Sequence, residues 1–160
     1  NERITRLASG VSVIRVGGAT DVEMTETKHR IEDALEAVSS AQKDGITTGG
    51  GTALLRAKND IDIEFENDDQ RLGSEILLKA CESPFRQLCR NGGMSEDILI
   101  SSIANQENQN IGYDFRNLCE VDMYESGIVD PVKVTKTALV NAVSAASTLL
   151  NTNHAIIQVE

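Results

Sequence analysis

The hydrophobic positions change period several times along the chain, and each change marks an expected element. From Glu26 to Asp44 apolar residues recur every three or four positions, which is typical of an amphipathic helix with one half-buried face. The apolar stripe consists of Ile31, Ala34, Leu35, Val38 and Ala41. We expect Thr25 or Thr27 to cap the start of this helix and Gly45 to end it. Asp33 falls on the opposite, polar face.

A glycine-rich run, Gly45–Gly51, interrupts the helical pattern, and a second apolar run, Thr52–Ala57, restarts it. Residues without side chains let the backbone turn sharply and approach another group closely. The run matches neither GxGxxG after a strand nor GxxxxGK[ST], so neither standard phosphate loop is supported. Two interpretations stay open: a plain joint between two helices, and a loop that approaches a ligand.

The chain beyond the glycine run is mainly helical in pattern. Asp60–Asp69 carries six acidic residues and predicts a solvated connection. A longer helix follows from Leu72, with a break at Pro84 and an end at Asn91-Gly92-Gly93, and Ser95 can cap the next short helix.

The last helix, Asp130–Leu150, is apolar or small nearly all round, which predicts burial on most of its sides. Asp130 is placed as its N-cap, with Pro131 at the first helical position, where a missing N–H costs nothing.

Short β-branched runs predict a few strands. They are Val11–Val16, Ile111–Phe115, Glu120–Tyr124 and Ala155–Val159, of which the second and third could form a small hairpin. The fold class is therefore mainly α with a few short strands, in two modules that meet at the glycine run.

Composition and charge exclude several classes of partner. The formal net charge of −10 opposes binding to a nucleic-acid backbone or an anionic membrane. Aromatic residues make up only 3% of the chain, with no tryptophan, so stacking platforms for bases are not expected. No run approaches 18 apolar residues, and no basic, apolar leader opens the chain, so neither a membrane span nor a signal peptide is expected.

Three cysteines without CxxC spacing predict reduced thiols in a cytosol-like compartment, and two histidines make a zinc site unexpected. Taken one at a time, the candidate chemical residues have structural explanations. Asp33 reads as a solvated residue of a charged helix face, and Asp130 as a helix cap. Tyr113 and Asp114 form either a turn or an edge that contacts a base.

The amino-acid sequences of several segments, and their order along the chain, resemble those of one protein family. Glu2–Thr20 looks like the run "ERxxKLxGGVAVIxVGAAT" of the group I chaperonins, the GroEL type. Lys28–Leu35 resembles their "KKxRVEDAL", and Gly45–Ala53 resembles "GVVAGGGVA". Further on, the similar runs are Glu82–Leu88 with "EAPLRQI", Ile111–Asp114 with "YGYNA", and Gly127–Thr135 with "GILDPTKVTR". Six motifs in the same order cover essentially the whole chain.

The resemblance implies a set of site residues. Asp33 matches the aspartate of the intermediate domain that swings over bound ATP and positions the attacking water. Gly50, within Gly49–Gly51, matches the glycine whose backbone approaches the nucleotide, and Asp130 matches the aspartate at the ribose and adenine end.

The chain departs from the family pattern beside the implied adenine contact. Asp114 stands where the family usually has an asparagine, and Phe115 and Arg116 replace small alanines. An acidic and a bulky residue at these positions would alter nucleotide affinity or selectivity.

The resemblance also implies an architecture and a function. Residues 1–11 would end the apical domain, 12–43 would belong to the intermediate domain, and 44–160 would form the C-terminal half of the helical equatorial domain. The whole protein would be an ATPase that binds ATP or ADP with Mg²⁺. It would form a heptameric ring of identical subunits, work with a cochaperonin and enclose unfolded polypeptide. Its location would be the cytoplasm or an equivalent organellar or viral host-cell compartment.

The family's phosphate loop "GDGTT" and its metal-binding aspartate do not occur in this sequence. The chain would therefore supply the catalytic Asp33 and one side of the nucleotide pocket, with no metal ligand of its own, and would not hydrolyse ATP alone. The alternative is a non-catalytic helical module that acts through oligomerisation.

Overall fold

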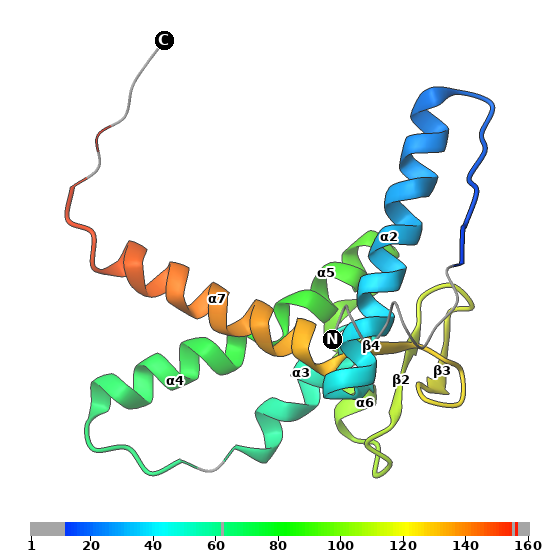
Figure 1. Ribbon diagram of the computed structural model, residues 1–160. Helices are drawn as coiled ribbons and strands as arrows, with labels where there is room; N and C mark the ends of the chain where they lie inside the picture. Colours follow the sequence, from blue (N-terminus) through cyan, green and yellow to red (C-terminus); the bar gives the residue numbers. More distant parts are fainter. Residues whose placement is uncertain (1–11, 62, 155, 157–160) are drawn as a thin grey trace. The chain divides into compact units, whose positions relative to one another are not determined.

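The computed structural model describes residues 12–61, 63–154 and 156 (Figure 1). The chain divides into two compact units, Asn1–Glu36 and Ala37–Glu160, with the boundary inside the helix α2 (Asp21–Asp44). The fold is mainly helical with short strands, as predicted. The residues before Ser12 lie outside the described residues, as does the predicted strand Ala155–Val159 except for Ile156.

The described part of the first unit, from Ser12 onward, consists of an extended segment followed by the N-terminal part of α2. The helix begins five residues earlier than predicted, so the expected cap at Thr25 or Thr27 is wrong. Thr20 Oγ1 accepts a hydrogen bond from the Glu23 backbone N–H at 3.2 Å, and Glu23 Oε2 accepts one from the Ala19 N–H at 2.8 Å. This Thr-x-x-Glu arrangement is close to a capping box, a sequence signal that marks the true start.

The apolar stripe of α2 is less buried than its pattern predicts. Leu35 and Val38 are each 55% exposed. The predicted strand Val11–Val16 is also not observed: the described residues from Ser12 onward are extended without strand pairing. A strand requires the backbone of a neighbouring strand, and the described residues offer none to this segment.

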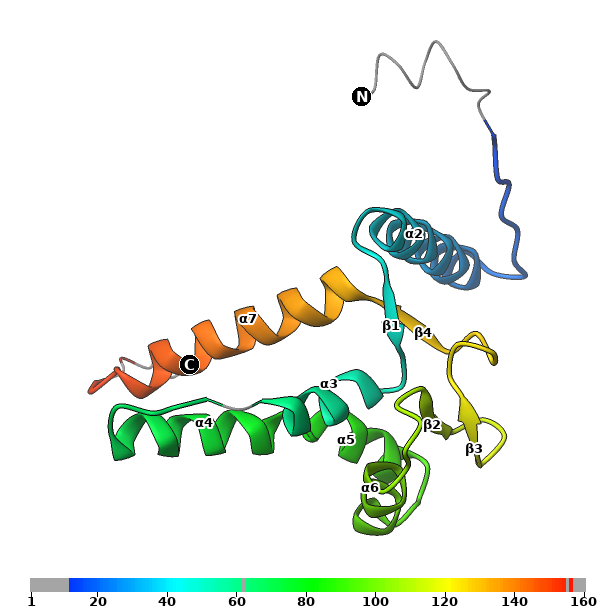
Figure 2. The ribbon, with the colours of Figure 1, turned by 90° about the horizontal axis from the view of Figure 1, so that it is seen from below.

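Three helices and one strand supply the core of the second unit, which Figure 2 shows beside the two strand pairs. The helices of this unit are α3 (Thr52–Ala57), with the 3-10 turn η1 (Lys58–Asp60), α4 (Asp68–Ala80), α5 (Ser83–Asn91), α6 (Glu96–Ala104) and α7 (Val132–Leu150). The core cluster consists of Leu55, Phe85, Cys89, Ile103 and Tyr113, from α3, α5, α6 and the strand β2. The break at Pro84 and the stop at Asn91-Gly92-Gly93 are confirmed, whereas Ser95 occupies the N-cap of α6 without a side-chain cap bond.

Two antiparallel strand pairs connect these helices. β2 (Ile111–Asp114) pairs with β3 (Cys119–Asp122), which confirms the predicted hairpin. β1 (Ile46–Thr48) pairs with β4 (Val129–Pro131), and this pair was not predicted. The glycine run therefore does not join one helix directly to the next, because three of its residues form β1 between α2 and α3.

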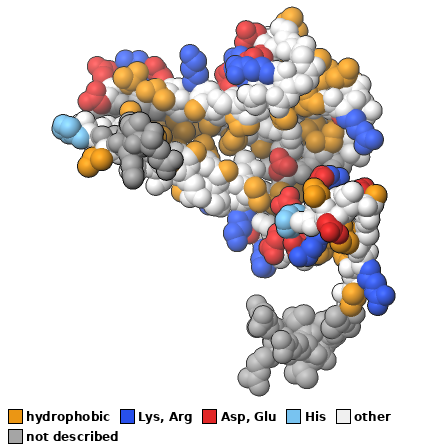
Figure 3. All heavy atoms as spheres, turned by 90° about the horizontal axis from the view of Figure 1, so that it is seen from above, with side chains coloured by type: hydrophobic (Ala, Val, Ile, Leu, Met, Phe, Trp, Pro, Cys, Tyr) orange, Lys and Arg blue, Asp and Glu red, His pale blue; other side chains and the backbone are white. Residues whose placement is uncertain are grey.

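Helix α7 is not buried on most sides, which corrects the prediction from its composition. Val140 is 58% exposed and Leu149 is 75% exposed, and no residue of α7 is fully buried. Figures 1 and 2 show α4 and α7 extending away from the core of the second unit on the same side. Figure 3 shows hydrophobic side chains open to view at the surface of the chain. An all-round apolar helix predicts a covering partner, and the main contacts of α7 among the described residues are with β4, the strand directly before it.

Candidate functional site

The glycine turn between β1 and α3, Gly49–Gly51, requires glycine because its backbone conformation and its close packing leave no room for side chains. Gly50 and Gly51 have φ angles of 61° and 73°, a backbone region that favours glycine. A Cβ on Gly51 would lie 2.9 Å from the Phe85 backbone nitrogen, so α5 leaves no room for a side chain. Gly51 is also the N-cap of α3. These contacts give the turn a fixed shape.

The pairing of β1 with β4 brings Asp130 to the same edge as the glycine turn. The register places Thr47 opposite Asp130 and Thr48 opposite Val129. One residue further on, the Gly49 N–H donates to the Ile128 carbonyl at 2.9 Å. The strand that carries Asp130 is therefore fixed to the chain that enters the turn.

Asp130 is a strand residue and not a helix cap, which corrects the sequence interpretation. Pro131 is the N-cap of α7, and no side chain caps that helix. The Asp130 carboxylate is half-buried and has no hydrogen-bond partner among the described residues. Burial raises the pKa of its carboxyl group above the ordinary value of 3.8. A carboxylate that loses water without gaining a donor is suited to accept hydrogen bonds from a ligand.

The strand β2 packs against the other side of the glycine turn. A Cβ on Gly50 would lie 3.8 Å from the Tyr113 carbonyl oxygen. A Cβ on Gly112 would lie 2.6 Å from Met123 Sδ and 2.8 Å from Thr52 Oγ1, so only glycine permits this approach. The structure thus brings together the three segments that hold the predicted binding residues: the glycine turn, β2 and β4.

The residues that depart from the family pattern have structural roles in the hairpin. Asp114 Oδ1 accepts hydrogen bonds from the backbone N–H groups of Arg116 and Asn117, and Asp114 Oδ2 accepts one from the Asn117 side-chain amide. These donors hold the pKa of the Asp114 carboxyl group below its ordinary value, with the Arg116 N–H as the largest cause. The carboxylate is thus largely occupied in closing the turn between β2 and β3.

Phe115 belongs to the edge of the core. Its ring centroid lies 5.6 Å from that of Phe85 and 5.1 Å from that of Tyr113. Arg116 is exposed at the end of the hairpin. The sequence could not reveal these roles, because the directions of the three side chains depend on the turn that Asp114 closes.

Asp33 lies on α2 in the first unit and is exposed. It makes no hydrogen bond or ion pair within the part of the chain that the structure describes. The predicted binding residues all belong to the second unit, so the structure assembles those residues without Asp33.

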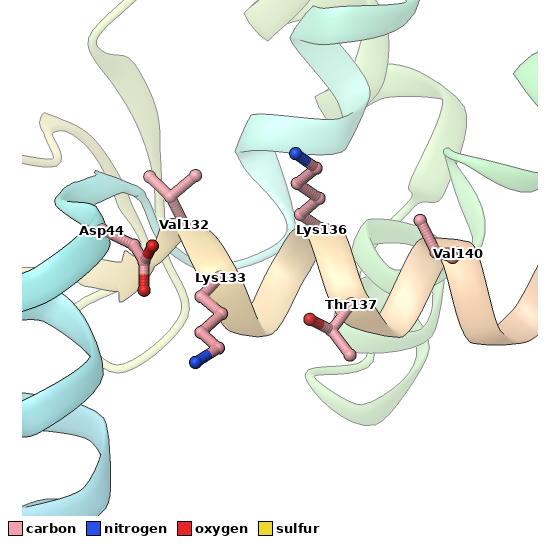
Figure 4. A pocket seen from close by; sticks show the side chains of 6 residues that line it. All are labelled: Asp44, Val132, Lys133, Lys136, Thr137 and Val140. Carbon is pink, nitrogen blue, oxygen red and sulfur yellow. The ribbon is translucent and has the colours of Figure 1, made fainter.

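A separate hollow lies beside the start of α7 (Figure 4). It has a volume of about 490 Å³ and is lined by Asp44, Val132, Lys133, Lys136, Thr137 and Val140. Sequence reasoning named none of these residues as site residues. Figure 4 shows the Lys133 and Lys136 side chains pointing apart, so their amines do not converge on one ligand.

The described residues contain no cluster of three or more His, Cys, Asp or Glu side chains that could hold a metal ion. None of their helices is long and apolar enough to cross a membrane. The half-buried Asp130 carboxylate, with no hydrogen-bond partner among the described residues, is a polar group at this edge that is able to accept hydrogen bonds.

Comparison with known proteins places the chain in a broader context. Residues 3–160 match the TCP-1/cpn60 chaperonin family. The chain is 45% identical over 153 residues to proteins named chaperonin GroEL from the Boryong and Ikeda strains of Orientia tsutsugamushi. This match covers 95% of the chain but 28% of each relative.

A solved structure shows the same fold. The crystal structure of a group III chaperonin in the open state matches with a TM-score of 0.75 and 26% sequence identity, over 88% of this chain and 30% of that one. The chain therefore spans less than a third of the length of the chaperonins to which it is similar.

Proposed function

Because the chain belongs to the TCP-1/cpn60 chaperonin family, we propose that it works as the C-terminal part of an ATP-dependent protein-folding chaperonin subunit. The full-length subunit would form a heptameric ring with identical subunits, act with a cochaperonin, and enclose unfolded polypeptide. Its place would be the cytoplasm or an equivalent compartment. Residues 12–43 would serve as the intermediate-domain segment and 44–160 as the equatorial part.

In this proposal the second unit supplies one wall of a nucleotide pocket. The observation that carries it is the Asp130 carboxylate, half-buried without a partner at the edge where the glycine turn, β2 and β4 meet. A ribose hydroxyl group can donate the hydrogen bond that this carboxylate lacks. Backbone groups of Gly49, Gly50 and Gly51 would face the nucleotide, and the hairpin end at Asp114, Phe115 and Arg116 would border its base.

The bound group would be ATP or ADP with Mg²⁺, whose charge neutralisation supports phosphoryl transfer. Asp33 would position the attacking water, the role that the resemblance implies for it. Phosphate and metal contacts would come from the N-terminal part of the subunit, so the 160-residue chain alone would not hydrolyse ATP.

A second candidate function is a non-catalytic helical module that acts through oligomerisation. The exposed apolar residues of α7 favour it, because such surfaces mark interaction sites. A module of this kind would not bind a nucleotide. A measurement of nucleotide binding therefore distinguishes it from the chaperonin function proposed above.

Replacing Asp130 by alanine is expected to weaken ADP affinity of the full-length subunit about tenfold or more, since a hydrogen bond to a charged group is lost. The unfolding free energy at pH 7 should not fall. A carboxyl group whose pKa is raised by burial opposes folding once the pH exceeds that pKa, so its removal relieves a cost. Calorimetric titration and urea unfolding would measure the two quantities.

The matched control is Glu107→Ala, which removes an exposed carboxylate from the loop before β2 and should change neither quantity. Asp130→Asn keeps the shape and should bind with intermediate affinity. Unchanged ADP affinity in Asp130→Ala would remove the main support for the nucleotide pocket.

A further inference from the structure

Arg56 connects the helix that follows the glycine turn to the segment that leads into β2. Its guanidinium donates hydrogen bonds to the carbonyl oxygens of Ile111 at 2.9 Å, Asn108 at 3.2 Å and Gln106 at 3.5 Å. These partners are 50 to 55 residues away in sequence. A single half-buried side chain thus holds the whole entry to β2.

These hydrogen bonds connect two segments that lie beside the glycine turn, α3 and β2. α3 follows its N-cap Gly51, which packs against Phe85, and carries Arg56 in its last turn. Arg56 donates to the carbonyl of Ile111, the first residue of β2, and β2 lies close to the glycine turn, since a Cβ on Gly50 would lie 3.8 Å from the Tyr113 carbonyl oxygen. The distance between β2 and the turn therefore depends on the Arg56 anchor.

Arginine is the one side chain suited to this task. Its planar guanidinium has five N–H donors in a fixed fork and can reach several carbonyl groups at once, whereas lysine has one compact ammonium group. The Asn108 carbonyl oxygen also accepts a hydrogen bond from the Ile111 N–H at 3.2 Å. If the guanidinium were removed, the three carbonyl groups would lose their Arg56 donor, and this backbone hydrogen bond would remain.

We propose that Arg56 is a positioning residue of the nucleotide pocket: it sets the spacing between β2 and the glycine turn, and so the width of the wall that the nucleotide contacts. The inference rests on the proposed nucleotide-binding function. Arg56 acts through its hydrogen bonds to the segment that leads into β2. Small displacements of binding groups change affinity strongly, because the geometry must be held before the ligand arrives.

The test compares Arg56→Lys and Arg56→Met in the full-length subunit by ADP titration and steady-state ATP hydrolysis. We expect the Kd for ADP and the KM for ATP to rise about tenfold in Arg56→Met and less in Arg56→Lys, which keeps one charged donor. The kcat at saturating ATP should stay within about twofold of the wild-type value, since Asp33 lies in another unit. If Arg56→Met does not fold, Arg56→Lys carries the test.

Two controls separate positioning from loss of stability. Arg71→Met removes an arginine of α4 whose ion pairs, with Asp68 and Glu75, are exposed, and it should change neither Kd nor KM. Cys81→Ala removes a buried thiol outside the core cluster, so it lowers stability without touching the anchor. A purely structural role for Arg56 would lower kcat through a smaller active fraction and leave KM unchanged, as in Cys81→Ala.

Wild-type-like Kd and KM in both Arg56 variants would overturn this inference while leaving the proposed function intact. Absence of nucleotide binding in the wild-type subunit would overturn the proposed function and the inference with it.

Discussion

Replacing Asp33 by alanine in the full-length subunit is expected to slow ATP turnover by about 10²-fold or more, the scale of losing a positioned proton-handling group. Nucleotide affinity should stay within about twofold of the wild-type value, because the predicted binding residues all lie in the second unit. Asp33 is exposed and makes no hydrogen bond in the described chain, so its removal leaves nothing unpaired. Phosphate release at saturating ATP and ADP titration would measure the two effects.

The matched control is Glu36→Ala, which removes a carboxylate from the same exposed face of α2, one turn further along. It should leave turnover unchanged. Normal turnover in Asp33→Ala would rule out the catalytic role of this residue, and equal loss in both variants would point to a general effect of charge on the helix.

Replacing Gly51 by alanine is expected to lower the free energy of unfolding of the chain by about 2–4 kcal/mol. The φ angle of 73° is costly for a residue with a side chain. The new Cβ would also lie 2.9 Å from the Phe85 backbone nitrogen, and backbone cannot move aside as a flexible side chain can. Urea unfolding followed by circular dichroism would measure the change.

Gly73→Ala provides the control, because Gly73 lies inside α4 and a Cβ there meets nothing within 4 Å. This substitution should raise stability by about 0.5–1 kcal/mol, since alanine is the better helix former. Similar stability in the two variants would show that the glycine turn does not have the tight packing on which the site depends.

Local signals in the sequence predicted much of the fold. Gly45 ends α2, as expected from a glycine after a helical stripe, and its φ of 85° explains the choice of residue. The β2–β3 hairpin and the break between α4 and α5 were also predicted, because each depends on a few neighbouring residues. The Thr20-x-x-Glu23 signal would have given the start of α2 as well.

Features that depend on distant contacts were not predicted. β1 has only three residues, and its pairing with β4, more than 80 residues away, gives no local pattern. The apolar composition of α7 predicted that the helix is buried, yet its large apolar residues are exposed. An apolar helix surface indicates that the helix needs a packing partner. It does not indicate that the same chain supplies that partner.

The candidate site shows the same division. The resemblance indicated the glycine turn, Asp114 and Asp130, and the structure brings their segments together. The resemblance could not indicate that the Asp114 carboxylate accepts hydrogen bonds within its own turn, whereas the Asp130 carboxylate has no partner among the described residues. Both hydrogen-bonding states depend on backbone geometry. The role of Arg56 was not predicted, because nothing in the sequence of a short helix indicates that its arginine donates hydrogen bonds to three distant carbonyl groups.

The shared nucleotide pocket can be tested by nucleotide titration of the chain, alone and mixed with the N-terminal portion of a group I chaperonin subunit. We expect no ADP binding by either part alone, and saturable binding by the mixture that is weakened by Asp130→Ala. A mixture that assembles without binding ADP, or full binding by the 160-residue chain alone, would contradict the claim that this chain forms one wall of a shared nucleotide pocket.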